Sequence, residues 1–341
     1  MEDGESGATQ GSEMESLDFE LANGLELVDL PECGSTGIPC NGACVGREAE
    51  MNGCQVLVGS TIYRGALQDS AGAYWVASHS AHSEFFVTDE GSGDLTLLGT
   101  HPKGNLFSLQ LALTAETIYY LLEGTPQTLW SMSRSGGEPV LVKEEMPLTR
   151  AFTVIGDSVY VALSSSPQLV RLALEGEETE TFERDVERLA HNGNDLYFLQ
   201  SVDDGDPELY RASNADIDQA ELLAEAVRAP ILGFDDDWVY AYRAGETISD
   251  RVLHRFAKNG SDSQPIVSLG SGDIAVLTPT AIVFTHSDYR TREFVNTVDH
   301  DGANRTVVGY LPAGTPRIGF MTADSTYVYV NKGFTLSRLR R

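Results

Sequence analysis

A strand pattern rich in aromatic residues recurs along this chain at a nearly constant interval. In each copy, a turn of Gly, Asp, Asn or Ser is followed by a short apolar and aromatic stretch. The central residues of these stretches are Tyr74, Tyr119, Tyr160, Tyr197, Tyr240, Val283 and Val328. Successive centres are 45, 41, 37, 43, 43 and 45 positions apart. Repeats of this length built from short strands are typical of β-propellers, in which each repeat forms a four-stranded blade. The sequence therefore predicts an all-β, seven-bladed propeller, and a six-bladed ring with one repeat misassigned is the alternative.

Each repeat predicts four strands in the same order, here called A, B, C and D. In the fourth repeat they are expected at residues 188–190, 196–199, 208–212 and 220–223. The turn between strands C and D repeatedly carries glycine, which supplies the positive φ that tight hairpins need. Examples are Gly136, Gly176, Gly260 and Gly302. The seventh repeat has strands A, B and C, but the sequence ends at Arg341 without a strand D.

A candidate for the missing strand lies at the other end of the repeat region. Residues 55–59 are apolar, precede the first repeat and have no repeat of their own. We expect them to pair with residues 335–340 as the outer strand of the last blade, because this closes the ring and removes an exposed edge. The chain then divides into a disordered acidic tether at 1–32, a disulfide-rich loop segment at 33–54 and the propeller at 55–341.

All four cysteines lie between the tether and the repeats, at Cys33, Cys40, Cys44 and Cys54. An even number of cysteines in a glycine-rich loop segment favours two disulfides and an oxidising compartment. The sequence leaves three pairings open. A zinc site and free thiols are the alternatives. Gaps of six, three and nine residues differ from the paired C-x2-C ligands usual in zinc knuckles.

The charge of the chain limits the partners it can bind. There are 51 acidic and 23 basic residues, for a net charge of −28, which repels nucleic acid and anionic membranes and favours solubility or cationic partners. No apolar run reaches the roughly 18 residues that would predict a transmembrane segment. An acidic, Ser/Gly-rich start is common in mature secreted proteins and lipoproteins, whose leader is not part of this sequence. We expect a secreted, periplasmic or cell-surface location and a monomer.

One sequence motif of the repeat resembles that of a known group of proteins. Asp195-Leu196-Tyr197-Phe198, followed by Leu209-Tyr210-Arg211, is similar to secreted bacterial repeat propellers of the TolB-like or DUF5050-like kind. The resemblance extends over nearly all of residues 60–341. It implies a propeller fold and a scaffold or a protein- or carbohydrate-binding module more than an enzyme.

A ligand site is expected on the face where the D–A and B–C loops gather around the channel mouth. The B–C loops of the fourth to sixth repeats are long and polar, at residues 203–206, 243–250 and 286–290. Lengthened loops on neighbouring blades favour one continuous binding surface. The last of these loops supplies the candidate ligand residues His286, Asp288, Tyr289 and Arg290. The expected function is a binding module, and the alternative is a propeller-fold hydrolase or lyase acting on a polysaccharide or ester at the same face.

Arginine recurs at the start of strand A in five repeats. These residues are Arg64, Arg150, Arg188, Arg228 and Arg317. If they converge at the channel mouth, their guanidinium groups would suit a carboxylate or phosphate. The alternative is a structural role in which each arginine links neighbouring blades through an acidic partner.

Metal and catalytic motifs are sparse. His79 and His82 flank a short turn and could chelate a metal, but a pair of histidines at a turn with no third ligand assigned is little support for a metal site. Candidates for a structural Ca²⁺ are Asp204, Asp206, Asp299 and Asp301, although Asp301-Gly302 is also an ordinary hairpin turn. The sequence contains no G-x-S-x-G, H-E-x-x-H or phosphate-loop motif. We therefore assign no catalytic residue and expect no cofactor.

Overall fold

A computed structural model gives the structure of the chain. It describes residues 20–21, 38–40, 43–45, 50–51, 54–58, 62–69, 72–79, 82–88, 95–102, 110–122, 124, 126–203, 205–244, 251–270, 272–287, 292–312, 318–324, 326–332 and 335–341. For the described residues up to 69, the structure gives the backbone but not the side chains. No helix in this described part has the length and apolar character needed to cross a bilayer.

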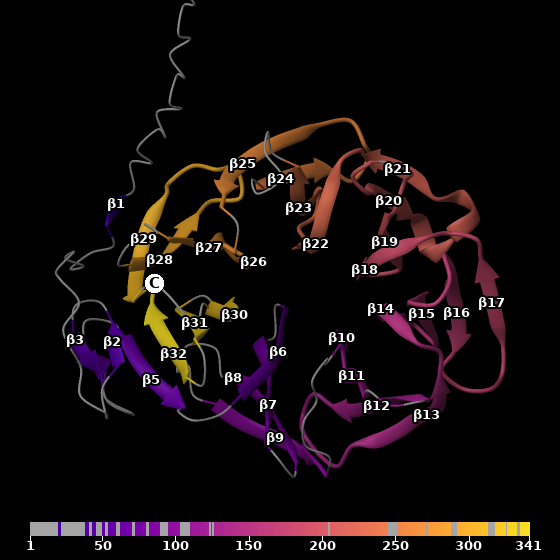
Figure 1. Ribbon diagram of the computed structural model, residues 1–341, viewed down its shortest axis with the longest axis horizontal. Coiled ribbons are helices and arrows are strands. Elements are labelled where there is room, and N and C mark those ends of the chain that lie inside the picture. Colours follow the sequence, from indigo (N-terminus) through magenta and orange to yellow (C-terminus); the bar gives the residue numbers. More distant parts are fainter. Residues whose placement is uncertain are drawn as a thin grey trace, which may run out of the picture.

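Seven antiparallel sheets surround a central axis, as Figure 1 shows, and each corresponds to one blade. Blade 1 contains β6 (Ile62–Asp69), β7 (Gly72–Ser78), β8 (Ser83–Thr88) and β9 (Leu95–His101). Blade 2 contains β10 (Gln110–Leu113), β11 (Thr117–Leu122), β12 (Gln127–Ser133) and β13 (Val140–Met146). Blade 3 contains β14 (Thr149–Ile155), β15 (Ser158–Leu163), β16 (Leu169–Ala173) and β17 (Thr179–Phe182). The first strand of each blade lies nearest the axis.

The later blades follow the same order. Blade 4 contains β18 (Val186–Asn192), β19 (Asp195–Gln200), β20 (Glu208–Ala212) and β21 (Glu221–Ala224), with two short 3₁₀ turns between β20 and β21. Blade 5 contains β22 (Val227–Phe234), β23 (Trp238–Ala244), β24 (Arg251–Ala257) and β25 (Ser263–Leu269). Blade 6 contains β26 (Ala275–Leu277), β27 (Ile282–Ser287), β28 (Arg292–Val298) and β29 (Thr306–Pro312). The predicted seven-bladed fold is confirmed, and the six-bladed alternative is excluded.

The ring closes with a strand from the N-terminal part of the chain. Blade 7 contains β30 (Ile318–Ala323), β31 (Tyr327–Lys332), β32 (Thr335–Arg340) and β5 (Cys54–Val58), in that order from the axis. In the register of the last pair, Leu336 lies opposite Val58 and Leu339 opposite Cys54. Both strands lie side by side near the C-terminus in Figure 1. The predicted pairing of residues 55–59 with residues 335–340 is confirmed.

Several short strands occur upstream of β5. In the segment predicted as a tether, β1 (Glu20–Leu21) pairs in parallel with the outer strand β29 of blade 6. In the segment predicted as loop, β2 (Ile38–Cys40) and β3 (Ala43–Val45) form a hairpin, and β4 (Glu50–Met51) pairs with β5. Strands of two or three residues are too short to show a periodicity in the sequence, so these strands were not predicted. The division into a tether, a disulfide-rich segment and the propeller stays a prediction.

The hydrophobic core is divided among the interfaces between neighbouring blades. Tyr197 and Leu199 of blade 4, for example, pack with Val227 and Phe256 of blade 5. Among the described residues, a separate buried cluster of this kind fills each of the seven interfaces. The aromatic strands that mark the repeat are buried in this way because each blade must cover the apolar face of the next.

Glycine in the C–D turns has the conformation that the sequence predicts. Gly176, Gly260 and Gly302 have φ values of 87°, 71° and 90°. A side chain is disfavoured in this left-handed region, so these tight turns need glycine. These turns hold strands C and D of blades 3, 5 and 6 in register.

Candidate functional site

Polar side chains link neighbouring blades at the face where the D–A and B–C loops lie. Gln110, at the start of β10, donates from Nε2 to the carbonyl oxygens of Thr149 and Arg150 at 3.2 and 3.1 Å. Arg150 in turn forms an ion pair of 3.1 Å with Asp185, next to the first strand of blade 4. Blades 2, 3 and 4 are thus linked in series at this face.

The same kind of contact continues around the ring. Arg228, at the start of β22, forms an ion pair of 2.9 Å with Asp206 in the B–C loop of blade 4. Arg251 donates to the carbonyl oxygen of Asp273 at 2.6 Å and so links blade 5 to blade 6. Lys332 of blade 7 and Glu293 of blade 6 form a largely buried ion pair of 2.6 Å.

We call this set of residues the polar belt. It consists of Gln110, Arg150, Asp185, Asp206, Arg228, Arg251, Asp273, Glu293 and Lys332. It joins blades 2 to 7 at the loop face. Partly buried ion pairs are screened less by salt than exposed ones, so the belt fixes the strand ends from which the loops project.

Two of the arginines predicted to form a ring belong to this belt. Arg150 and Arg228 each contact a carboxylate of a neighbouring blade, which is the arrangement that the structural alternative describes. Arg188 differs, because it is exposed and donates to the carbonyl oxygen of the adjacent Glu187 at 2.8 Å. The side chain of Arg64 and all of Arg317 lie outside the described residues. The anion site as a whole therefore stays a prediction.

The predicted loop residues are only partly described. His286 lies at the end of β27, with Nδ1 3.8 Å from Oδ2 of Asp273. Asp288, Tyr289 and Arg290 lie outside the described residues. The structure thus brings His286 next to a belt carboxylate that the sequence analysis did not nominate.

The calcium candidates take part in other contacts. Asp206 pairs with Arg228, and Asp204 lies outside the described residues. Asp299 accepts a hydrogen bond from the Asn304 side chain at 2.6 Å, and Asp301 accepts one from the backbone N–H of Ala303 at 2.9 Å. These last contacts stabilise the C–D turn of blade 6. A structural Ca²⁺ stays a prediction.

The candidate disulfides also await a test. Cys33 lies outside the described residues, and the side chains of Cys40, Cys44 and Cys54 are not described. The backbone places Cys40 and Cys44 on the two strands of the β2–β3 hairpin, with Cys44 opposite Pro39. The connectivity of the disulfides is thus still a prediction.

At the opposite end of the ring, the A–B hairpins surround a wide cavity in the central channel. It has a volume of about 810 Å³ and is lined by β10, β14, β18 and β22 with their A–B turns. Thr153 of blade 3 and His191 of blade 4 line it and are hydrogen-bonded to each other at 2.8 Å. Burial lowers the pKa of His191 below its usual value, since desolvation disfavours the charged ring. The pair is another link between blades.

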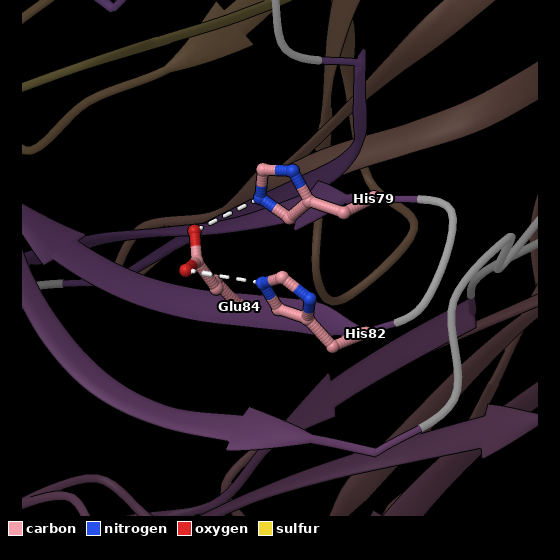
Figure 2. Close-up of side chains that lie close together, drawn as sticks. All are labelled: His79, His82 and Glu84. Atoms are coloured by element: carbon pink, nitrogen blue, oxygen red, sulfur yellow. Dashed lines mark hydrogen bonds and ion pairs between the residues drawn. The ribbon is translucent and has the colours of Figure 1, made fainter.

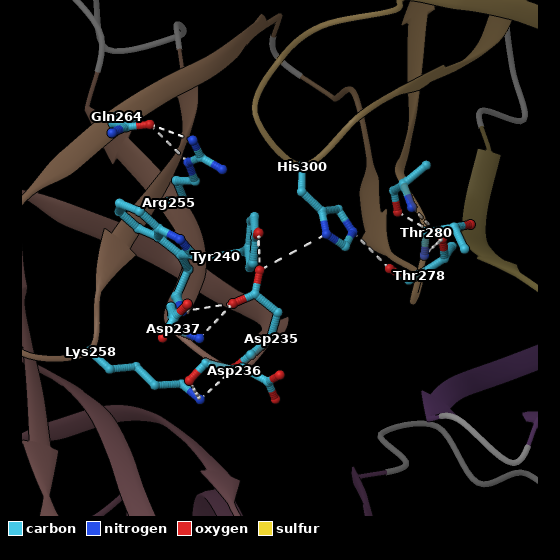
Figure 3. Close-up of polar contacts among 12 residues, drawn as sticks. Asp235, Asp236, Asp237, Tyr240, Arg255, Lys258, Gln264, Thr278, Thr280 and His300 are labelled. Carbon is cyan, nitrogen blue, oxygen red and sulfur yellow. Dashed lines mark hydrogen bonds and ion pairs between the residues drawn. The ribbon is translucent and has the colours of Figure 1, made fainter.

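A second cavity of about 510 Å³ lies between blades 4, 5 and 6 at the same end. Figure 3 shows His300 between Asp235 and Thr278 at its edge. Nε2 of His300 is 2.9 Å from the carbonyl oxygen of Thr278, so it carries the proton and donates it. Nδ1 is 4.0 Å from Oδ2 of Asp235. A histidine beside an aspartate resembles a catalytic pair, but a protonated Nε2 bound to a carbonyl cannot act as a base.

Asp235 has a structural role that another blade repeats. Its Oδ1 accepts from the backbone N–H of Trp238 at 2.8 Å, and its Oδ2 accepts from the Tyr240 hydroxyl at 2.5 Å. In blade 7, Asp324 accepts from a backbone N–H of the same turn and from the Tyr329 hydroxyl at 2.6 Å. Burial and the adjacent carboxylate raise the pKa of both tyrosines. We therefore interpret Asp235 and Asp324 as residues that fix the A–B turn.

One group of side chains has the residue types and spacing of a metal site. His79 and His82, at the B–C turn of blade 1, stack with ring centroids 4.5 Å apart. Figure 2 shows both rings directed at Glu84, with Nε2 to carboxylate oxygen distances of 2.9 and 3.3 Å. The three ligand atoms lie within 4.8 Å of one another. The two histidines were candidates from the sequence and Glu84 was not, although alternation along a strand puts residues 82 and 84 on the same face.

Comparisons with known proteins support the fold. The chain matches no family model and no curated protein in sequence. Among solved structures, it is similar to an acylaminoacyl peptidase of Pyrococcus horikoshii, with a TM-score of 0.54 and 10% identity over 80% of this chain and 49% of that one. It is also similar to an oligogalacturonate lyase in complex with manganese, with a TM-score of 0.51 and 11% identity over 80% of this chain and 78% of that one.

A third solved structure is BamB from Moraxella catarrhalis, at a TM-score of 0.49 and 11% identity over 84% of this chain and 98% of that one. At such identities the likenesses concern the fold alone. Membership of a TolB-like or DUF5050-like family stays a prediction.

Proposed function

We propose that this protein is an extracellular or cell-surface binding module that presents its D–A and B–C loop face to a protein or carbohydrate partner. The observation that carries the proposal is the polar belt, which links blades 2 to 7 at this face. A surface whose loop bases are already fixed loses less conformational entropy on binding. Such preorganisation is useful to a binding module whatever the identity of the partner.

The charge of the chain favours a cationic protein surface over an anionic one. Acidic residues outnumber basic ones by 51 to 23, and two arginines of the loop face are already paired with carboxylates. Complementary charge raises association rates and selects against wrong partners. The exposed Leu148 in a D–A loop adds an apolar contact point on this face. The extracellular location is part of the proposal, and four cysteines clustered before the propeller support it.

A hydrolase or lyase acting on a polysaccharide or ester at the same face is the second candidate. The observation in its favour is the pair of His286 and Asp273, 3.8 Å apart at the loop face. A histidine next to a carboxylate is a common arrangement of a general base, although 3.8 Å is longer than a hydrogen bond. Two of the solved structures of similar fold are named as a lyase and a peptidase, and this likeness extends to the fold only.

Matched surface variants test the binding proposal. Leu148→Asp changes an exposed leucine of the loop face, and Leu222→Asp makes the same change on the outer strand β21 of blade 4. Retention of cell-surface proteins and array glycans by the immobilised protein should fall at least tenfold for Leu148→Asp, because the apolar contact is lost, and stay unchanged for Leu222→Asp. Equal retention by both variants would contradict binding at the loop face.

The enzymatic candidate has its own test. Turnover of a polysaccharide and ester panel by the wild-type protein, lost in His286→Ala while Leu222→Asp retains it, would establish catalysis at the loop face. Such a result would replace the binding module by the hydrolase or lyase.

A further inference from the structure

We propose that His79, His82 and Glu84 form a binding site for a divalent first-row transition-metal ion on the B–C turn of blade 1. The inference is independent of the binding function proposed above. It depends on residue type, on the backbone that places the three side chains and on the distances between their ligand atoms.

The hairpin of β7 and β8 brings the three side chains to one side. Ser78 lies opposite Ser83 in the register, and the backbone N–H of His79 donates to the carbonyl oxygen of His82 at 2.9 Å. This bond makes His79 and His82 the facing residues at the end of the hairpin. Side chains that face each other across antiparallel strands lie on the same face of the sheet. Glu84 lies two residues along β8, and alternation puts it on that face too.

The distances are already close to those of a coordinated ion. Zinc lies about 2.0–2.2 Å from histidine nitrogen and carboxylate oxygen. Two ligand atoms at such distances from one ion are separated by about 3.0 Å at octahedral angles and about 3.4 Å at tetrahedral angles. The two nitrogen–oxygen distances are 2.9 and 3.3 Å, to the two different oxygens of the Glu84 carboxylate. All the ligand atoms lie within 4.8 Å of one another. Binding would require each Nε2 to present its lone pair and each Nδ1 to carry the proton, which is a change of tautomer.

The set of ligands selects the class of ion. Imidazole suits Zn²⁺, Cu²⁺, Ni²⁺ and Co²⁺, whereas Ca²⁺ and Mg²⁺ prefer six or more oxygen ligands. Three protein ligands leave at least one coordination position open. The side chains of His79, His82 and Glu84 are 32%, 40% and 28% exposed, so the open position faces solvent. A ligand with its own oxygen or nitrogen donor could enter it.

A hydrogen-bonded cluster without metal is the competing interpretation. Two neutral histidines donating to one carboxylate give the same distances and the same stacked rings. The two interpretations differ in their response to metal, because the cluster alone offers no site of fixed stoichiometry. A chain of net charge −28 also attracts cations loosely, so the test must distinguish one specific site from diffuse binding by carboxylates.

The full chain is titrated with Zn²⁺ in 0.15 M salt and excess Mg²⁺, and isothermal titration calorimetry measures the heat of binding. We expect one site per chain, with affinity lowered at least about 10- to 100-fold in His79→Ala, His82→Ala and Glu84→Gln, since even residues behind the metal ligands cause losses of this size. His300→Ala, at the opposite end of the ring, is the control and should keep the wild-type affinity. Thermal melts of all variants would establish that each is folded.

Copper provides a readout that a merely structural role would not affect. The electron paramagnetic resonance spectrum of the Cu²⁺-loaded protein should show coupling to two imidazole nitrogens, and His79→Ala should reduce this to one. Zinc affinity equal in wild type and in the His79→Ala/His82→Ala double variant would overturn the proposal, as would copper spectra with oxygen ligands alone.

Discussion

Removal of the closing strand tests the architecture most directly. Deletion of residues 1–60 takes away β5, so β32 becomes an unpaired edge of blade 7. Four residue pairs join β5 to β32. At about one hydrogen bond per pair and about 0.5–1.5 kcal/mol for each, the lost bonds amount to about 2–6 kcal/mol.

The side chains of β32 add to this cost. Leu336 and Leu339 are fully buried, and exposure of half of each would cost about 1.5–3 kcal/mol in total, given about 1.5–3 kcal/mol for a complete leucine. The free energy of unfolding should therefore fall by roughly 3.5–9 kcal/mol. Thermal melts followed by circular dichroism, and urea unfolding, measure the change.

Deletion of residues 1–32 is the control, because it keeps β5 and, among the described residues, removes the two-residue pairing of β1 with β29. It should change the melting temperature by a few degrees at most. Val56→Pro is a point version of the first deletion, since proline removes a hydrogen-bond donor inside a strand paired with Ser337. Equal melting of the two deletions, or an unchanged Val56→Pro protein, would refute closure by this strand.

Three further predictions concern single residues. Trp75→Ala should lower the free energy of unfolding by about 3–5 kcal/mol in urea titrations, because Trp75 fills the interface of blades 1 and 7 beside Tyr329. Arg228→Ala should lower the free energy of unfolding by about 1 kcal/mol, because its ion pair with Asp206 is lost. Arg188→Ala should change it by no more than about 0.5 kcal/mol, and the urea midpoints of the two variants measure the difference. The pKa of His254 is lowered to about 4 by burial and by nearby Arg243. As the pH falls, the unfolded chain therefore binds a proton at this histidine before the folded chain does. The contribution of His254 to the free energy of unfolding is complete above about pH 6.5 and is lost progressively down to about pH 4. His254→Gln should flatten this decline in melts across that range, and an unchanged pH profile would contradict it.

The repeat allowed the ring to be predicted from the sequence. The spacing from Tyr197 to Tyr240 reports the length of a whole blade, and the apolar residues 55–59 precede the first repeat without a repeat of their own, so they could be assigned to the outer edge of a blade. Both are properties of chain length and periodicity, which can be determined from the amino-acid sequence alone. The two-residue strands β1 and β4 carry no such periodicity, so their pairing was not predictable.

The role of Arg150 and Arg228 could not be predicted, because it depends on contacts between repeats and not on the sequence within one repeat. Arg150 and Arg228 recur at equivalent positions, but their partners, Asp185 and Asp206, come from neighbouring blades and from different loops. Which carboxylate meets which guanidinium depends on the angle and offset between blades. The sequence could therefore present an anion site and a structural link as alternatives without deciding between them.

In a repeat protein, a polar group that recurs is most simply explained by the fold, and a group that occurs once needs another explanation. The Asp235–Tyr240 contact has a counterpart in Asp324–Tyr329, and both serve the same turn, so His300 beside Asp235 does not argue for catalysis. The turn with His79 and His82 has no counterpart, because no other B–C segment carries two histidines, and the sixth has His286 alone. Stability of a blade therefore does not require these two rings in the B–C turn. Two stacked imidazoles directed at one carboxylate are a departure from the repeat, and the metal site proposed above would give all three residues one common function.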